Sequence, residues 1–175
     1  MIAEEHIIKE MVMDIAKKMI VAARTAPKGK GADTFTFCIA EKEDILKISA
    51  AMKEIGHKFD APGFLRDAEN ILSATVIILL GTVIKPLGLK KCGMCGFKNC
   101  EAKPNNIPCV FNTGDLGIAI GSAVSVAAQH HIDNRVMYTV GQAALELGLL
   151  GKDVRIAYAI PLAVTSKNPF FDRKQ

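Results

Sequence analysis

The sequence predicts an α+β protein in which helices flank a sheet and one long irregular loop is inserted. Three observations predict this class: apolar residues recur at helical spacing in several segments, aliphatic segments of strand length lie between them, and residues 84–112 show no periodicity. The chain has 175 residues, of which 50% are hydrophobic, enough for one domain with its own core. We therefore expect a single domain over 1–175, with 84–112 as a metal-binding insertion.

The N-terminal part predicts a helix followed by a strand. The helix covers residues 3–25, and its apolar stripe consists of Ile7, Ile8, Met11, Val12, Ile15, Met19 and Ala22. Pro27 ends it, because the residue before a proline disfavours helical geometry. Residues 28–33 form a loop, and residues 34–40, which are rich in β-branched and aromatic side chains, form a strand.

The next segments predict two helices and a buried strand. Apolar residues recur on one side of residues 43–55, and Gly56 is a natural helix end. A further helix covers residues 62–73, since a proline is tolerated in the first turn. Residues 75–82 lack polar alternation, so this strand should be buried on both faces.

After the irregular segment, two helices and a last strand are expected. One helix, rich in glycine, alanine and serine, runs from Asp115 as its N-cap to about His131. The other runs from Asp133, again as N-cap, to Leu147. Residues 154–164 form a final buried strand.

Four cysteines in the irregular segment predict one metal centre. Cys92 and Cys95 form a C-x2-C pair, Cys100 follows closely, and Cys109 comes eight residues later. Clustered cysteines without a disulfide context indicate metal or redox chemistry. Thiolates are soft ligands that favour iron–sulfur clusters, zinc or copper(I). We predict a [4Fe-4S] cluster, in which backbone N–H groups after the glycines approach the cluster sulfides.

Zinc is the alternative ligand for the same four cysteines. Structural zinc sites more often show two paired ligand sets, whereas the second half of this motif is C-x8-C. Lys98 and Lys103 would add positive charge near either centre. Cys38 stands alone in an apolar strand and is expected to be a small buried hydrophobe.

Two resemblances extend this interpretation. The run Cys92-Gly-x-Cys95-Gly-x-x-x-Cys100 is similar to the [4Fe-4S] motif of the corrinoid subunit of carbonyl dehydrogenase/acetyl-CoA synthase and of ferredoxin-type electron carriers. The surrounding chain resembles the nitroreductase superfamily: residues 22–30, Ala-Ala-Arg-Thr-Ala-Pro-Lys-Gly-Lys, are similar to its A-A-R-x-A-P-S-x-x-N loop. The combined pattern resembles a family of uncharacterised proteins that contain a ferredoxin domain.

The second resemblance implies a nitroreductase-like mixed sheet flanked by helices, an intertwined homodimer and bound FMN. The implied FMN contacts are Arg24, Lys28 and Lys30 at its polar edge and Arg173 or Lys174 at its phosphate, because these side chains make charge-assisted hydrogen bonds. The family's N-terminal arginine-rich motif is absent here. Arg24 has a second interpretation, as a cation that favours the C-terminal end of a helix.

The sequence thus predicts a redox protein carrying a [4Fe-4S] cluster, with FMN as a second cofactor, for electron transfer or flavin-dependent reduction. The alternatives are a binding or structural protein whose loop is held by zinc, and a protein-partner module that delivers electrons or a cluster to a larger enzyme. No residue stands out as a catalytic acid or base.

Charge and hydropathy limit the kinds of binding partner and the cellular compartment that we expect. The net charge of +4 is scattered and lacks interleaved aromatics, so nucleic acid is not expected. The N-terminus has early acidic residues, unlike a signal peptide, and no apolar run approaches the roughly 20 residues of a membrane helix. We expect a cytoplasmic homodimer that meets a redox partner protein.

Overall fold

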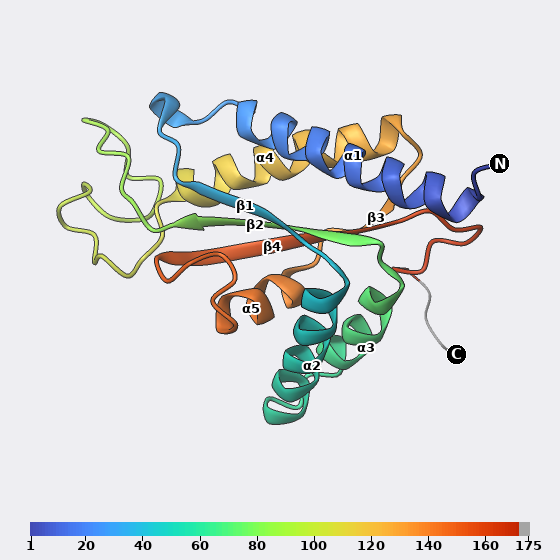
Figure 1. Ribbon diagram of the computed structural model, residues 1–175. Coiled ribbons are helices and arrows are strands. Elements are labelled where there is room, and N and C mark those ends of the chain that lie inside the picture. The colour runs from blue at the N-terminus through green and yellow to red at the C-terminus, as the bar shows by residue number, and fades with distance from the viewer. Residues whose placement is uncertain (172–175) are drawn as a thin grey trace.

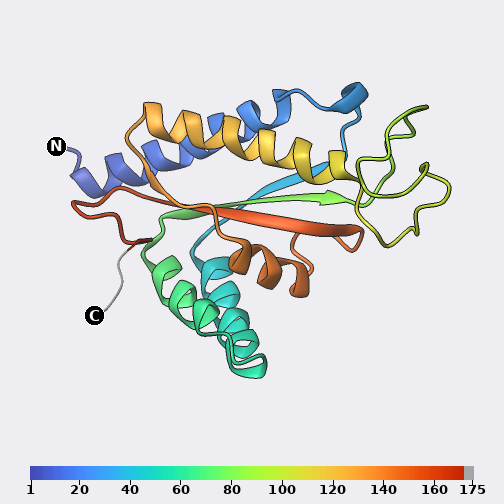
Figure 2. The same ribbon diagram turned by 180° about the vertical axis from the view of Figure 1, so that it is seen from behind.

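A four-stranded sheet separates two layers of helices in the computed structural model, which describes residues 1–171. Helices α1 and α4 cover one face of the sheet, and α2, α3 and α5 cover the other (Figures 1 and 2). The helices are α1 (Glu4–Thr25), α2 (Lys42–Lys58), α3 (Pro62–Asn70), α4 (Val110–Gln129) and α5 (Tyr138–Glu146). Two short 3₁₀ helices are η1 (Gly29–Gly31) and η2 (Ile71–Ser73).

The strands lie in the order β1-β2-β4-β3, and each pair within residues 1–171 is antiparallel. The strands are β1 (Phe35–Ala40), β2 (Val76–Val83), β3 (Asp133–Asn134) and β4 (Val154–Ala163). The α+β prediction is confirmed, but the mixed pairing that the resemblance implied is absent from this part of the chain. The reason is visible in β1 and β2: α2 and α3 return the chain so that Ile77 pairs with Ala40, where β1 ended.

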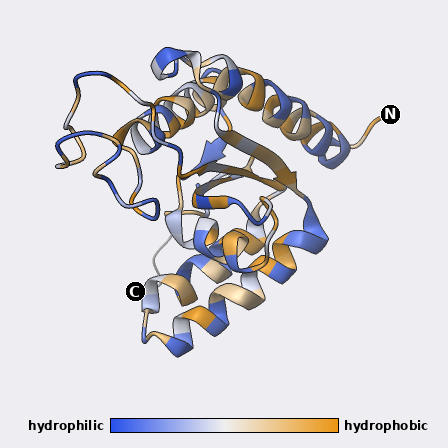
Figure 3. Cartoon of the chain, turned by 90° about the vertical axis from the view of Figure 1, so that its left-hand side faces the viewer, coloured by the Kyte–Doolittle hydropathy of each residue, from blue (hydrophilic) through white to orange (hydrophobic). Residues whose placement is uncertain are grey.

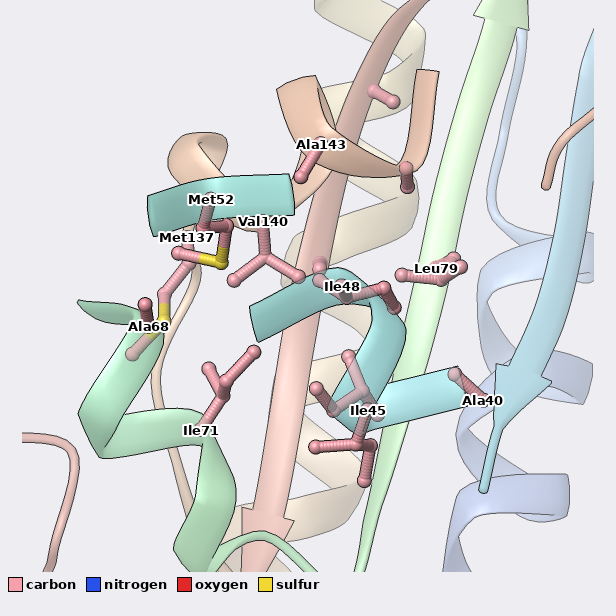
Figure 4. Close-up of a cluster of buried hydrophobic side chains, with 14 of the residues drawn as sticks. Ala40, Ile45, Ile48, Met52, Ala68, Ile71, Leu79, Met137, Val140 and Ala143 are labelled. Carbon is pink, nitrogen blue, oxygen red and sulfur yellow. The ribbon is translucent and has the colours of Figure 1, made fainter. Parts of the chain in front are cut away.

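Strand β2 is buried on both faces, as its sequence predicted. Ile77 and Leu79 belong to a core shared with α2, α3 and α5. Figure 4 shows Leu79 in this core with Ile45, Ile48 and Val140. Val76, Ile78 and Leu80 point the other way, into a core shared with α1 and α4. Alternate residues of one strand therefore supply both cores, as the period of two requires.

Helices α3 and α5 are joined by a buried carboxylate. Asp67 is 3% exposed and accepts a hydrogen bond from Thr139 Oγ1 at 2.8 Å. The same carboxylate pairs with Arg66 at 2.7 Å. Arg135, which lies near Asp67, donates to the carbonyl of Phe170 at 2.8 Å and so holds the end of the described chain against this layer.

Most predicted elements agree with the structure to within a few residues. The helix predicted over 62–73 ends at Asn70, and its last turn is the 3₁₀ helix η2. The irregular segment is shorter than 84–112, because α4 already begins at Val110.

Both aspartates predicted as N-caps were assigned wrongly. Asp115 lies inside α4, whose N-cap is Cys109, and its carboxylate instead accepts from the backbone N–H of Gly29 at 2.9 Å. Asp133 lies in β3 and pairs with Ala163, and α5 does not begin until Tyr138. In both cases a contact distant in sequence outweighs the local preference of aspartate for a helix start.

Candidate four-cysteine metal centre

The four clustered cysteines lie on a loop that projects beyond the end of the sheet (Figures 1 and 2). The loop leaves β2 after Val83 and returns at Val110, and residues 84–109 contain neither helix nor strand. Figure 3 faces this end of the molecule and shows hydrophilic and hydrophobic residues alternating along the loop. Its backbone lacks the regular hydrogen bonds of a helix or strand, so its shape depends on a small number of side-chain contacts.

Asn112 holds the two ends of this loop together. Its Oδ1 accepts from the backbone N–H of Lys85 at 3.1 Å and from that of Cys109 at 3.3 Å. The Asn112 side chain is buried, and Lys85 and Cys109 lie at the beginning and at the end of the loop. Sequence reasoning missed this residue, although an amide three residues after a helix N-cap is a recognised capping signal.

All four cysteines line one pocket within the loop. Cys109 is buried, Cys95 and Cys100 are half-buried, and Cys92 is exposed; all are free thiols. The pocket has an empty volume of about 440 Å³, part of it open to solvent. Its apolar walls are formed by Leu87, Leu89, Phe97, Val110 and Phe111. Thiols separated by up to seventeen positions in sequence therefore face a common space.

Two glycines shape the C-x2-C turn. Gly93 and Gly96 follow Cys92 and Cys95 and have φ of 82° and 85°, a conformation that favours glycine. The N–H of Gly96 donates to the carbonyl of Gly93 at 2.9 Å. The sequence predicted that this N–H would point into the pocket toward a cluster. In the structure it is instead used to close the turn.

The donor set fits a soft metal, although the loop is not closed around one. Among residues 1–171, no three histidine, cysteine, aspartate or glutamate side chains are grouped tightly enough to hold a metal ion. Four thiols in one pocket are nevertheless the ligand set of iron–sulfur clusters and of structural zinc. Metal sites of this kind commonly complete their geometry only when the metal binds.

Lys103 is a buried cation in the wall of the same pocket. It is 4% exposed, and its Nζ donates to the carbonyl of Pro104 at 3.0 Å and to that of Ile107. Within the described chain its partners are these neutral carbonyls and no carboxylate. Because a buried charge is costly unless it is compensated, this site favours an anionic occupant.

Two of the predicted FMN contacts are engaged within the chain. Arg24 pairs with Asp33 at 2.7 Å and lies 4.5 Å from the centre of the Phe37 ring. Burial, the largest single cause, raises the pKa of Asp33, but the hydrogen bonds from Arg24 and from the Phe35 N–H, together with the charges of Arg24 and Lys28, lower it by more, so the pKa of this carboxyl lies below its usual value. Lys28 turns back to the end of α1 and donates to the carbonyls of Ala26, at 2.9 Å, and Arg24.

Lys30 lies apart from these two and lines a second pocket beside the first. This pocket has an empty volume of about 540 Å³, and its polar lining comprises Lys30, Thr34, Lys85, Asn112 and Asp115. It shares Leu87 and Phe111 with the cysteine pocket. Arg173 and Lys174, the predicted phosphate contacts, lie outside the described residues.

Cys38, predicted to be structural, lies in β1 and packs against the core formed with α2, α3 and α5. Its Sγ lies 3.9 Å from the carbonyl of Leu149. Burial raises the pKa of this thiol, with Asp44 as a smaller cause in the same direction. A thiol held protonated is a poor nucleophile and a poor metal ligand.

Comparison with known sequences assigns the family. The profile of the family described as "uncharacterized protein containing a ferredoxin domain (DUF2148)" matches residues 105–173. An uncharacterised protein of Archaeoglobus fulgidus is 38% identical over 179 aligned positions, which cover 97% of this chain and 96% of that protein. The chain belongs to this ferredoxin-domain family. The resemblance stated from the sequence is thereby confirmed.

Solved structures show the same fold as this member of the ferredoxin-domain family. A Bacteroides fragilis nitroreductase with bound FMN has a TM-score of 0.61 at 12% identity, covering 93% of this chain and 82% of that one. A putative Desulfovibrio desulfuricans nitroreductase in complex with FMN has a TM-score of 0.58 at 18% identity, covering 93% and 79%. The nitroreductase-like fold is therefore confirmed, while these identities are too low to transfer a ligand.

We predict that Asn112→Ala destabilises the loop, since it removes the acceptor of two backbone N–H groups. The free energy of unfolding should fall by about 1–3 kcal/mol, the cost of leaving buried donors unsatisfied. Limited proteolysis should cut within residues 85–109 of the variant faster than in the wild type. Asn99→Ala is the matched control, because Asn99 is exposed and, within residues 1–171, its Oδ1 accepts a single hydrogen bond, from the backbone N–H of Ala102 at 2.9 Å. Equal cleavage of the two variants would contradict the role assigned to Asn112.

Proposed function

We propose that this protein is a redox protein that binds a [4Fe-4S] cluster through Cys92, Cys95, Cys100 and Cys109. The observation that carries the proposal is the shared pocket of these four free thiols. Membership of a ferredoxin-domain family and a nitroreductase-like fold support a redox role. Iron–sulfur clusters bound by four thiolates exchange single electrons.

The chain's own residues have separate tasks in this proposal. The four thiolates would bind the cluster, and Leu89 and Phe97 form apolar parts of the wall that shield it from water on that side. Lys103 supplies positive charge from within the wall, where water does not screen it. Cys109 stands at the N-terminus of α4, whose backbone dipole favours a negative ligand.

A flavin is the second cofactor of this proposal, and the second pocket is its place. Lys30 and Lys85 bring two positive charges to that pocket, and Leu87 and Phe111 separate it from the cysteines. FMN bound there would convert single electrons into two-electron reduction of a substrate. Arg24 and Lys28 would have to leave their present partners to reach it.

Zinc remains the second candidate for the four cysteines, as the metal of a non-catalytic binding or structural protein. The loop over residues 84–109 has no core of its own, and a closed four-thiolate zinc site would supply its order. Lys103 suits this alternative equally, because zinc bound by four thiolates is also an anionic centre.

We further propose a cytoplasmic homodimer joined through α4. Among the helices of residues 1–171, α4 alone has the length and hydropathy of a membrane span, a test that core helices of soluble proteins also pass. Only 33% of the apolar stretch of α4 is buried, although the helix packs on α1 and the sheet. Its exposed outer face carries the small residues Gly114, Gly117, Gly121 and Ser125, which permit close approach of a second helix, and one large apolar side chain, Ile118.

Anaerobic purification tests the metal. The wild type should show a broad absorbance shoulder near about 400 nm and contain iron and sulfide, since thiolate-bound iron absorbs there. Cys95→Ser should lose iron and sulfide, and Cys38→Ser, outside the pocket, should keep both. Flavin bands in the same spectrum would support the second cofactor. A colourless wild type containing zinc would replace the redox proposal by the structural one.

Lys103→Met should lower the reduction potential of the iron centre, because loss of a nearby positive charge disfavours the more negative reduced state. Each tenfold change in the reduction equilibrium corresponds to about 59 mV. A redox titration followed by electron paramagnetic resonance measures this shift. Lys98→Met is the control, since Lys98 lines the same pocket but is exposed to screening solvent. Equal reduction potentials in the Lys103→Met and Lys98→Met variants would contradict the role proposed for Lys103.

Gly121→Arg should convert a dimer into a monomer, because a long cation on the outer face of α4 prevents close helix packing. Light scattering coupled to size-exclusion chromatography measures the mass. Gly63→Arg is the control: this glycine of α3 also has open space around a Cβ, but lies in the opposite helical layer. A wild type that is monomeric at all concentrations would refute the dimer.

A further inference from the structure

The net charge of the protein is concentrated in the cysteine loop. Residues 84–109 contain five lysines and one acidic residue, Glu101. The rest of the chain then holds 17 of the 22 basic and 17 of the 18 acidic residues, so it is balanced. The formal charge of +4 thus belongs to a segment of 26 residues, which the sequence had suggested was scattered.

The lysines of this loop fall into different roles. Lys103 is buried in the pocket wall, and Lys85 lines the second pocket. Lys90, Lys91 and Lys98 are exposed to solvent, and Lys90 and Lys98 also line the open cysteine pocket. Exposed charges are screened by water and contribute little to the stability of a neighbouring group. These three lysines are therefore better suited to contact another molecule than to compensate the pocket.

Exposed apolar and thiol groups lie among these lysines in the sequence and on the same loop. Met94 is 68% exposed, and Cys92, the most exposed of the four cysteines, is two residues before it. Ile107 is 36% exposed on the returning arm of the loop. Methionine is adaptable and common at surfaces that bind varied partners. The most exposed cysteine thus shares its pocket with two exposed lysines, Lys90 and Lys98, and its loop with exposed apolar groups.

We propose that Lys90, Lys91, Lys98 and Met94 form the docking surface for an acidic one-electron carrier protein. This inference rests on the proposed iron–sulfur function. In each encounter the carrier would lose one electron, and the four-cysteine centre would gain it, so that no bond forms or breaks. Positive charge near the exposed ligand would steer an acidic partner to the edge where electron transfer is shortest.

The loop is less suited to nucleic acid, the other common acidic partner. Single-stranded nucleic acids bind through basic grooves with exposed aromatic side chains on which bases stack. The only aromatic residue of residues 84–109 is Phe97, which is half-buried and lines the cysteine pocket. A small basic patch with one apolar contact instead matches the small, weak interfaces of electron-transfer encounters.

Stopped-flow electron transfer from a reduced acidic [2Fe–2S] ferredoxin to the metal-loaded protein tests this surface. The wild-type second-order rate constant should fall steeply between about 0.01 M and about 1 M salt, over which the Debye length decreases from about 30 Å to about 3 Å. The Lys90→Glu/Lys91→Glu variant should be slower by about tenfold or more at low salt. Lys17→Glu/Lys18→Glu is the matched control: an adjacent lysine pair, but on the exposed side of α1.

The outcomes distinguish this surface from the proposed function. Iron and sulfide contents that are equal in all variants, with only the loop variant slow, would support the docking surface. Equal rates for both double variants, or rates independent of salt, would overturn it while the iron–sulfur function stands. Tighter binding of a short single-stranded RNA than of the ferredoxin at the same salt would also overturn it. A protein that holds no iron would end both proposals.

Discussion

The double burial of β2 is the constraint on which the rest of the structure depends. Its aliphatic side chains alternate between two cores, so neither helical layer can be removed without exposing one face of this strand. Near its end, Thr82 is fully buried and its hydroxyl is hydrogen-bonded to that of Thr34 at 2.8 Å. One residue later the chain leaves the sheet. The cysteine loop therefore projects from a rigid base.

The loop itself has the opposite character. It has no regular backbone hydrogen bonding, and Asn112 connects its two ends through backbone donors. The four thiols are already gathered into one pocket, which lowers the conformational entropy that metal binding must overcome. They are not yet grouped as a metal site, so closing of the loop and binding of a metal would be one coupled event.

Sequence reasoning succeeded where the determinants are local. Helical stripes and the unbroken aliphatic run of β2 require only neighbouring residues to be recognised, and the C-x2-C spacing identifies the thiol pair in the same way. It failed where a distant partner decides. Asp115 does not cap a helix because Gly29, distant in sequence, supplies the N–H it accepts. Asp133 lies instead in the two-residue strand β3, which pairs with β4 and which no local sequence pattern predicts.

In the candidate site, too, the features with local determinants were predictable and those that depend on distant residues were not. Four cysteines within eighteen residues were sufficient to predict a common pocket, but the buried position of Lys103 depends on how the loop folds. The flavin contacts show the limit of a motif. Arg24 matches the family loop, yet Asp33, nine residues later, and the Phe37 ring now engage it. A motif specifies residue types, but whether a side chain is free to bind a ligand depends on its neighbours in space.

Helix α4 connects the features on which the proposals rest. Its N-cap is a candidate ligand, Cys109, and its first turns carry Phe111, shared by the two pockets, and Asn112. One turn later Asp115 accepts from Gly29, in the loop that bears Lys30. Cys109, Phe111, Asn112 and Asp115 thus bring both pockets to the N-terminal end of one helix. The two pockets therefore share a wall, and in the proposed homodimer the outer face of the same helix would meet the second copy of the chain.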